Sequence, residues 1–217
     1  MQIHHLSENN SVLNHFLGQV RNVNVHSDRM RFRRNIERIG EVMAYELSKK
    51  LHYATIEIQT PLGIKKTTEI KDQLVLCSIL RAGLPLHLGF LNYFDNADNG
   101  FISAYRYHPN NDNYFEIKVE YQAVADIENK VILLIDPMLA TGQSIVAVFN
   151  RLMERGTPKE IHIAVVVAAP EGIAYLEEHL PSNCHLWIAA LDEKLNEEKY
   201  IVPGLGDAGD LAFGDKL

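Results

Sequence analysis

Five short segments that are mostly apolar, without the alternation of a half-exposed strand, constrain the fold of this chain more than any other feature. They are LVLCSIL (74–80), GFISAYR (100–106), VILLID (131–136), IHIAVVVAA (161–169) and HLWIAAL (185–191). Strands of this kind are typical of a parallel sheet that helices cover on both faces. Helical patterns lie between several of them, over residues 84–94, 143–155 and 171–179. The succession of strand, helix and strand predicts an α/β fold with a doubly wound, mostly parallel sheet.

The remaining segments add simpler elements. Apolar residues recur at spacings of three and four over residues 32–51, which predicts a helix capped near Ser27 or Asp28. Alternating segments at 53–59 and 64–70 flank a Pro-Leu-Gly turn and predict a β-hairpin arm. Residues 115–124 alternate and predict an antiparallel edge strand or hairpin, and the chain from Tyr200 onward reads as a glycine-rich loop. At 217 residues without a repeat or long linker, we expect a single domain over residues 1–217.

Charge and cysteine usage narrow the class of partner. The formal net charge of −7 argues against broad binding to nucleic acid or anionic lipid, and the basic run at residues 29–34 is interpreted as a solvated helix face. Cys77 and Cys184 lie in apolar runs and are expected to be buried free thiols. The N-terminus has no signal-peptide pattern, His4 and His5 are expected in a mobile terminus, and no apolar run is long enough to span a bilayer. We therefore expect a cytoplasmic protein.

Three charged residues come at the ends of apolar strands. Arg81 and Asp136 close two of them, and Arg106 closes a third. Ligands of open α/β sheets bind at the carboxyl ends of the strands. These three side chains are therefore expected to meet at one edge of the sheet.

The stretch LLIDPMLATGQS (133–144) has the properties of a phosphate site. A helix beginning near Gln143 leaves its first amides without intrahelical partners, and its dipole favours an anion there. Thr141 and Ser144 offer hydroxyl donors, Gly142 allows close approach, and Asp136 can accept hydrogen bonds from sugar hydroxyls or hold a metal-bound water. Alone, the stretch is equally compatible with an ordinary strand, proline turn and helix cap.

The stretch SILRAGLP (78–85) follows another strand. Arg81 beside Ala82 and Gly83 combines a forked cation with an unobstructed backbone, which suits a diphosphate. Taken alone, Arg81 is better explained as a surface arginine before a helix, and Arg106 as a solvated charge at a strand end. The convergence of both with a helix N-terminus favours a phosphate-rich ligand.

The tail YIVPGLGDAGDLAFG (200–214) spells G-x-G-x-x-G, but too few residues follow for a dinucleotide fold. Its aspartates do not have EF-hand spacing. A tight glycine loop can bring main-chain donors and acceptors to the edge of a planar base. The sequence shows no local metal motif, no nucleophile elbow and no Walker A sequence.

Together these stretches resemble the uracil phosphoribosyltransferases, of the type I phosphoribosyltransferase family. DPMLATGQS is similar to their loop for phosphoribosyl pyrophosphate (PRPP), ILRAGL to their diphosphate loop, and YIVPGLGDAGD to their base-binding tail. RFRRNIERIGEVMAYE and VVVAAPEGI extend the resemblance to nearly the whole chain. The resemblance implies transfer of the phosphoribosyl group from PRPP to uracil, giving UMP and diphosphate in pyrimidine salvage, with Mg²⁺ held mainly by PRPP. It also implies a C-terminal base-binding loop.

The resemblance assigns roles to particular residues. The catalytic residues that it implies are Arg81, Arg106 and Asp207. The PRPP-binding residues that it implies are Arg81, Arg106, Asp136, Pro137, Met138, Leu139, Ala140, Thr141, Gly142, Gln143, Ser144 and Asp207. The uracil-binding residues that it implies are Ile201, Gly206, Asp207 and Ala208, acting through main-chain groups, and no residue is expected to hold the metal directly.

Two positions depart from the family pattern. Gln143 stands where a second glycine is common, and Tyr107 where an asparagine is common, so we expect activity with an altered PRPP affinity. The family also suggests a homodimer or higher homo-oligomer and a GTP effector. Two other functions stay open: a regulator that binds nucleotide or RNA without turnover, and the same transfer to another base.

Overall fold

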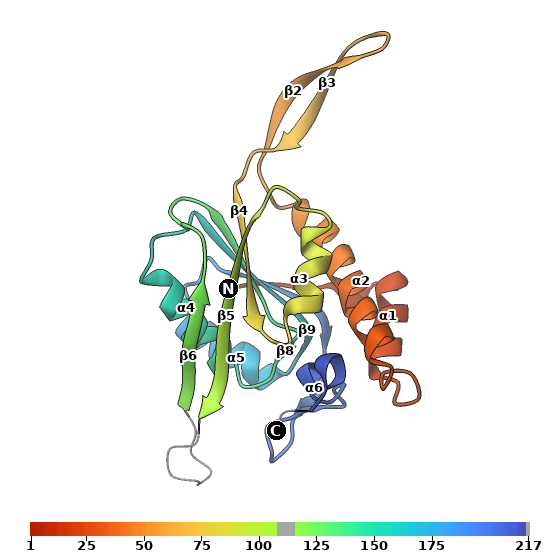
Figure 1. Cartoon of the computed structure of the whole chain (residues 1–217), viewed down its shortest axis with the longest axis vertical. Coiled ribbons are helices and arrows are strands. Elements are labelled where there is room, and N and C mark those ends of the chain that lie inside the picture. The colour runs from red at the N-terminus through yellow and green to blue at the C-terminus, as the bar shows by residue number, and fades with distance from the viewer. Residues whose placement is uncertain (108–115, 216–217) are drawn as a thin grey trace.

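An eight-stranded sheet forms the centre of the molecule (Figure 1). The structure is a computed structural model that describes residues 1–107 and 116–215, and the side chains of residues 106, 107 and 116 lie outside the description. The strands of the sheet are β1 (Gln2–His5), β4 (Leu74–Leu80), β5 (Asp98–Tyr107), β6 (Glu116–Ala123), β7 (Val131–Ile135), β8 (Met138–Leu139), β9 (Glu160–Ala168) and β10 (His185–Leu191). Their order is β1-β10-β9-β7-β4-β5-β6, and β8 pairs with β9. Every pair is parallel except β5 with β6, which confirms both the parallel sheet and the antiparallel edge strand.

Helices cover the two faces of the sheet, and each face has its own core. Helices α1 (Val12–Arg21), α2 (Arg29–Ser48), α3 (Leu84–Leu91) and α6 (Ala208–Phe213) pack on one face, and α4 (Gln143–Met153) and α5 (Pro170–His179) on the other (Figure 1). Strand β7 shows why the run is apolar throughout. Leu133 and Ile135 belong to the first core, and Ile132 and Leu134 to the second. Burial of both faces removes the alternation that an edge strand would show.

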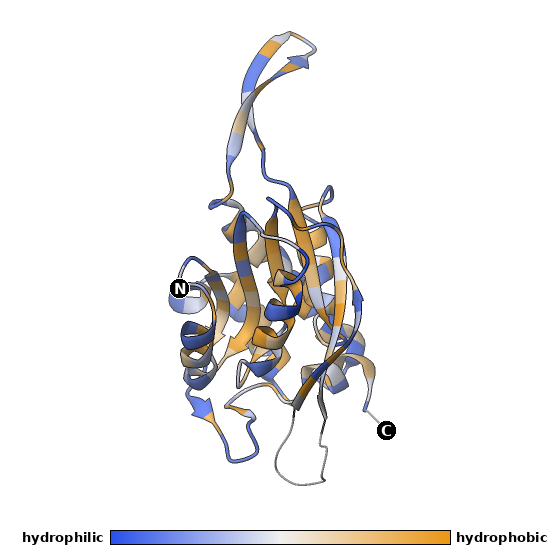
Figure 2. Cartoon of the chain, turned by 90° about the vertical axis from the view of Figure 1, so that its left-hand side faces the viewer, coloured by the Kyte–Doolittle hydropathy of each residue, from blue (hydrophilic) through white to orange (hydrophobic). Residues whose placement is uncertain are grey.

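Helix α2 and the hairpin arm follow the sequence pattern. The carboxylate of Asp28 accepts a hydrogen bond from the Arg31 amide at 3.1 Å, which confirms the predicted cap. Strands β2 (Tyr53–Thr60) and β3 (Gly63–Ile70) pair antiparallel and project from the body as a separate arm (Figures 1 and 2). Leu62 at the tip of the arm is 99% exposed. The arm therefore leaves apolar surface outside the core of this chain.

The chain termini differ from the prediction. His4 and His5 belong to β1, which pairs with β10, so the expectation of a mobile terminus was wrong. The His4 ring stacks on Trp187 with the centroids 3.9 Å apart, and this contact anchors the strand. The tail is likewise more ordered than a loop, because it contains β11 (Lys194–Leu195), β12 (Ile201–Val202) and α6. A short 3-10 helix, η1 (Leu6–Glu8), follows β1.

The two cysteines and the basic run have the burial that the sequence predicts. Cys77 and Cys184 are buried and free, as expected, and burial raises their pKa values to about 12 and about 11. The basic run is exposed except at Phe32, which is buried, and Arg33, which is half-buried and donates to the Ala212 carbonyl of α6 at 2.6 Å. Within the described ranges, no helix is both long enough and apolar enough to cross a membrane.

Candidate active site

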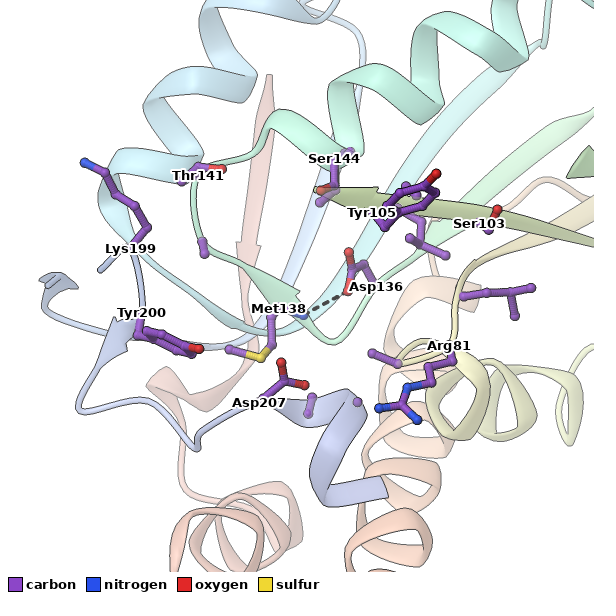
Figure 3. A pocket seen from close by; sticks show the side chains of 18 of the residues that line it. Arg81, Ser103, Tyr105, Asp136, Met138, Thr141, Ser144, Lys199, Tyr200 and Asp207 are labelled. Atoms are coloured by element: carbon purple, nitrogen blue, oxygen red, sulfur yellow. Dashed lines mark hydrogen bonds between the residues drawn. The ribbon is translucent and has the colours of Figure 1, made fainter. Parts of the chain in front are cut away.

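A cavity of about 1030 Å³ opens at the carboxyl edge of the sheet (Figure 3). Four segments that are distant in sequence line it: the β4–α3 loop, strand β5, the β7–α4 loop and the C-terminal tail. Its lining residues are Ile79, Leu80, Arg81, Ala82, Ser103, Ala104, Tyr105, Asp136, Met138, Ala140, Thr141, Gly142, Ser144, Ile145, Lys199, Tyr200, Gly206, Asp207, Ala208, Gly209 and Asp215. The strand ends therefore meet the tail around one space, as the position of ligand sites in α/β sheets predicts.

Asp136 lines this cavity and lies directly after β7 (Figure 3). Its amide donates to the Ala164 carbonyl at 3.2 Å, and its carboxylate accepts a hydrogen bond from the Met138 amide at 3.3 Å. Desolvation by burial raises the pKa of Asp136 to about 7, although the hydrogen bond from Met138 acts in the opposite direction. The carboxyl group can therefore change its charge near neutral pH and can accept hydrogen bonds from ligand hydroxyls.

The loop from Ala140 to Ser144 places a helix N-terminus at the cavity. Gly142 caps α4 with φ of +80° and no side-chain hydrogen bond, so the first amides of α4 stay available to a ligand. A Cβ on Gly142 would lie 3.0 Å from the Tyr175 ring and 3.1 Å from the Gly172 carbonyl. Helix α5 thus supports the loop from behind, and the combination of positive φ and close packing requires glycine.

Arg81 follows β4 and reaches across to α6. The peptide bond between Leu80 and Arg81 is cis. The Arg81 Nη2 donates to the Asp210 carboxylate at 2.6 Å and to the Gly214 carbonyl at 2.6 Å. Its Nε is buried and has no hydrogen-bond partner among the described residues. The C-terminal segment therefore holds one end of the guanidinium and leaves a buried donor beside the cavity.

The tail forms the other wall of the cavity. Asp207 caps α6, and its carboxylate accepts a hydrogen bond from the Asp210 amide at 3.0 Å. Gly206 has φ of +97°, a conformation that side chains rarely adopt, and Gly206 and Ala208 line the cavity with Asp207. Ile201 is 5% exposed, packs in the core and pairs with Leu195 in the short β11–β12 hairpin, so its side chain lies behind the lining.

The structure brings together most of the residues that the sequence selected. Arg81, Asp136, Met138, Ala140, Thr141, Gly142, Ser144, Gly206, Asp207 and Ala208 line the cavity. Pro137, Leu139, Gln143 and Ile201 belong to the same loops but are not among its lining residues. The backbone of Arg106 lies in β5 opposite Ile117, but its side chain and that of Tyr107 are outside the described residues.

Sequence reasoning missed several lining side chains. Ser103 and Tyr105 precede Arg106 on β5, and Lys199 and Tyr200 precede Ile201 in the tail. The only indication of these residues in the sequence was that they lie within a few positions of Arg106 or Ile201. The Tyr105 hydroxyl donates to the Glu120 carboxylate of β6 at 2.5 Å, which ties this side chain to the edge strand.

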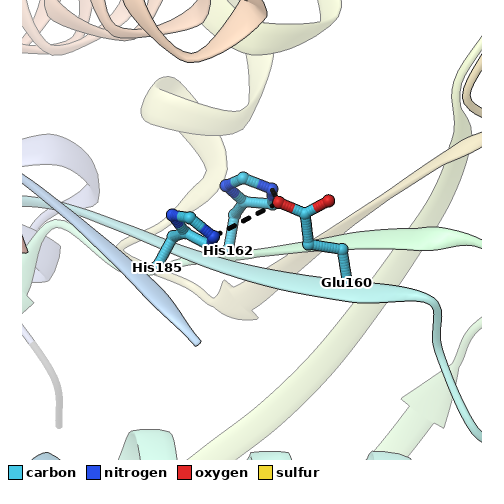
Figure 4. Close-up of side chains that lie close together, drawn as sticks. All are labelled: Glu160, His162 and His185. Atoms are coloured by element: carbon cyan, nitrogen blue, oxygen red, sulfur yellow. Dashed lines mark ion pairs between the residues drawn. The ribbon is translucent and has the colours of Figure 1, made fainter. Parts of the chain in front are cut away.

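A second group of titratable side chains lies at the opposite, amino edge of the sheet (Figure 4). The Glu160 carboxylate lies 3.1 Å from Nε2 of His162 and 3.3 Å from Nε2 of His185. The Trp187 indole donates to Nδ1 of His162 at 2.9 Å, so the neutral imidazole carries its proton on Nε2. A protonated Nε2 has no lone pair for a metal ion, and the group is therefore better described as imidazoles around a carboxylate. Burial, together with the charges of His185 and His4, lowers the pKa of His162 to about 3.

Comparisons with known proteins show which family the sequence and the fold resemble. The family model described as uracil phosphoribosyltransferase matches residues 7–215. A uracil phosphoribosyltransferase of Porphyromonas gingivalis is 50% identical over 217 residues, which cover 100% of both chains. One of Thermococcus gammatolerans is 37% identical over 195 residues, covering 88% of this chain and 85% of the relative. The solved structure of the AQ2163 protein from Aquifex aeolicus is 27% identical, covers 100% of both chains and superposes with a TM-score of 0.88.

Proposed function

The chain belongs to the uracil phosphoribosyltransferase family, and on that basis we propose that the cavity at the carboxyl edge of the sheet is its catalytic site. The reaction transfers the phosphoribosyl group of PRPP to uracil and yields UMP and diphosphate, a step of pyrimidine salvage. The observation that carries the assignment of the site is the convergence of Arg81, the N-terminus of α4 and the glycine-rich tail around one cavity. The domain that performs this reaction extends over residues 1–217 in this proposal.

In this proposal, PRPP occupies the cavity along the β7–α4 loop. Its 5′-phosphate accepts hydrogen bonds from the free amides of α4 and from the hydroxyls of Thr141 and Ser144. Asp136 accepts hydrogen bonds from the ribose hydroxyls. Pro137, Leu139 and Gln143 support this loop from outside the cavity. The diphosphate lies toward Arg81, where the buried Nε supplies a donor.

In this proposal, the C-terminal tail binds uracil. Main-chain groups of Ile201 and of Gly206 to Ala208 bind the base, and the positive φ of Gly206 supports a close approach of the backbone. The Asp207 carboxylate accepts a hydrogen bond from a ring N–H of uracil, and this proton leaves for solvent or for the departing diphosphate as the bond to the anomeric carbon forms. The weak acidity of the N–H makes a strong base unnecessary. Displacement at the anomeric carbon passes through an oxocarbenium-like state, so stabilisation of the departing diphosphate by Arg81 and Arg106 dominates the rate.

Magnesium fits the donor set of the cavity. Asp136, Asp207 and Asp215 line it, and carboxylate oxygens are ligands that Mg²⁺ prefers. Mg²⁺ would be held mainly by PRPP, and Asp207 is the side chain of this chain that would approach it. When bound, Mg²⁺ neutralises charge on the diphosphate as it leaves.

Three further properties belong to the same proposal. The exposed apolar tip of the β2–β3 arm supports a homodimer or higher homo-oligomer, which light scattering after size exclusion tests. The buried free thiols support a cytoplasmic protein. GTP is proposed as an effector from the family resemblance, and turnover with and without GTP tests it.

A base panel tests the function directly. The purified protein is incubated with PRPP and Mg²⁺ and with uracil, cytosine, hypoxanthine, guanine or orotate in turn, and nucleotide and diphosphate are both quantified. Formation of UMP from uracil alone supports the proposal. Turnover of another base would reassign the base-binding tail, and RNA binding that weakens with salt, without UMP formation, would favour a regulator.

A further inference from the structure

Arg21 and Asp192 form a largely buried ion pair just outside the cavity. The Arg21 Nη2 lies 2.6 Å from the Asp192 Oδ1, and its Nη1 lies 2.9 Å from Oδ2. The exposed fractions of the two side chains are 24% and 5%. Paired donors and acceptors of this geometry fix orientation as well as distance. Neither residue is among those lining the cavity.

The same two side chains bind both ends of one residue in the tail, Gly204. The Gly204 amide donates to the Asp192 Oδ2 at 2.9 Å, and its carbonyl accepts a hydrogen bond from the Arg21 Nη1 at 2.9 Å. Gly204 has φ of +64°, and a Cβ there would lie 2.2 Å from the Ile201 carbonyl oxygen. The turn is therefore tight, and its glycine is held by a charged group on each side.

Asp192 connects this turn to the rigid part of the molecule. It follows β10, and its own amide donates to the carbonyl of Ala168, the last residue of β9, at 2.8 Å. The next amide, that of Glu193, donates to the Val202 carbonyl at 3.1 Å. Arg21 is the last residue of α1, which packs on α2 and β10. The position of Gly204 is thus set by the sheet edge and by a helix.

We propose that Arg21 and Asp192 are positioning residues for uracil, acting through Gly204. The inference rests on the proposed role of the tail, where main-chain groups of Ile201 and of Gly206 to Ala208 read the base. The position of a main-chain donor or acceptor depends on the contacts that fix the backbone around it. In this tail, Arg21 and Asp192 supply such contacts. Gly204 lies between these two sets of groups, and a displacement of about 1 Å in a binding element can cost up to about a hundredfold in rate.

The test separates uracil from PRPP. Arg21→Lys keeps the charge but removes the fork, and Asp192→Asn keeps one acceptor but removes the ion pair. Each variant is assayed at saturating PRPP with varied uracil, and then at saturating uracil with varied PRPP. The expected result is a KM for uracil raised about tenfold, while the KM for PRPP changes less than about twofold. A general loss of folded protein cannot produce this split, because it lowers the apparent kcat and leaves both KM values unchanged.

Asp72→Asn is the matched control. The Asp72 carboxylate is 2% exposed, contacts Lys159 and accepts a hydrogen bond from the His52 amide at 2.7 Å, at the amino edge of the sheet. This variant is expected to lower Tm while both KM values stay unchanged. An unchanged KM for uracil in Arg21→Lys and Asp192→Asn, or an equal rise for both substrates, would overturn the inference. Unmodified protein that forms no UMP would instead refute the proposed function on which it rests.

Discussion

The Arg81 guanidinium and the Asp210 carboxylate join the β4–α3 loop to the C-terminal helix, with Nη2 2.6 Å from Oδ1. The same Nη2 donates to the Gly214 carbonyl. In the proposed arrangement, the loop for the diphosphate and the tail for the base are therefore joined by one side chain, and the C-terminal segment restricts how Arg81 presents its remaining donors.

Removing the charge of Asp210 is expected to lower the catalytic efficiency, kcat/KM, for PRPP. Asp210→Asn leaves Arg81 without its charged partner, and a half-exposed pair of this kind contributes at most about 1 kcal/mol. We expect kcat/KM for PRPP to fall up to about fivefold, measured by initial rates at saturating uracil. Asp98→Asn is the control, because Asp98 pairs with Lys130 at the amino edge. A higher PRPP efficiency in Asp210→Asn would show that Asp210 competes with phosphate for Arg81.

Asp207→Asn separates catalysis from folding. The Asp207 side chain caps α6, and asparagine caps helices about as well as aspartate, so Tm is expected to stay within a few degrees of the unmodified protein. The proposed charged acceptor for uracil is lost, which corresponds to roughly 1.5–3 kcal/mol. Turnover measured by UMP formation should fall by about tenfold to a hundredfold. Wild-type turnover with an unchanged melting curve would remove Asp207 from the catalytic residues.

The pKa of Asp136, raised to about 7 by burial, predicts a pH-dependent affinity for PRPP. Ribose hydroxyls donate to the ionised carboxylate better than to the neutral acid. Affinity should therefore increase as the pH rises through 7, and be about tenfold weaker at pH 6 than at pH 8. Calorimetric titration with PRPP and Mg²⁺ over this range measures it. Asp136→Asn has no such titration, so the difference between the two profiles isolates Asp136 from the ionisation of PRPP itself.

Replacing Gln143 with glycine should change little at the ligand. The sequence suggested that this side chain narrows the phosphate cradle or donates to it, but it is not among the lining residues and its Oε1 is buried without a partner among the described residues. Gln143→Gly is expected to alter the KM for PRPP by less than about threefold and to lower stability by up to about 1 kcal/mol, since glycine is a poor helix former. A larger drop in KM would show that Gln143 obstructs the phosphate.

The sheet and the loops around the site could be predicted because local patterns specify them. Strand β7 is apolar on both faces because both faces are buried. The polar residue Asp136 follows it because this position lines the cavity. Gly142 is recognisable as a residue of a tight loop before a helix. Hydrophobic periodicity and turn chemistry act over a few residues, so one sequence is enough to read them.

The contacts between distant segments could not be predicted in this way. The pairing of Arg81 with Asp210 joins positions 129 apart, and that of Arg21 with Asp192 joins positions 171 apart. Strand β1 is only four residues long and carries two histidines, so its place beside β10 has no local signature. Helix α6 is six residues long and begins within a glycine-rich stretch that resembles loop. In each case tertiary packing, and not local preference, decides the structure.

The buried imidazole of His162 predicts how stability depends on pH. Its folded pKa is about 3, below the ordinary value of 6.5, so the unfolded chain binds more protons between these values. Stability should therefore fall as the pH drops below about 6.5 toward pH 4. His162→Asn retains an acceptor for the Trp187 indole but does not titrate, so its unfolding free energy, measured by denaturant titration from pH 7 to pH 4, should change less steeply. His15→Asn on the exposed side of α1 is the control, and equal slopes for the unmodified protein and His162→Asn would contradict the prediction.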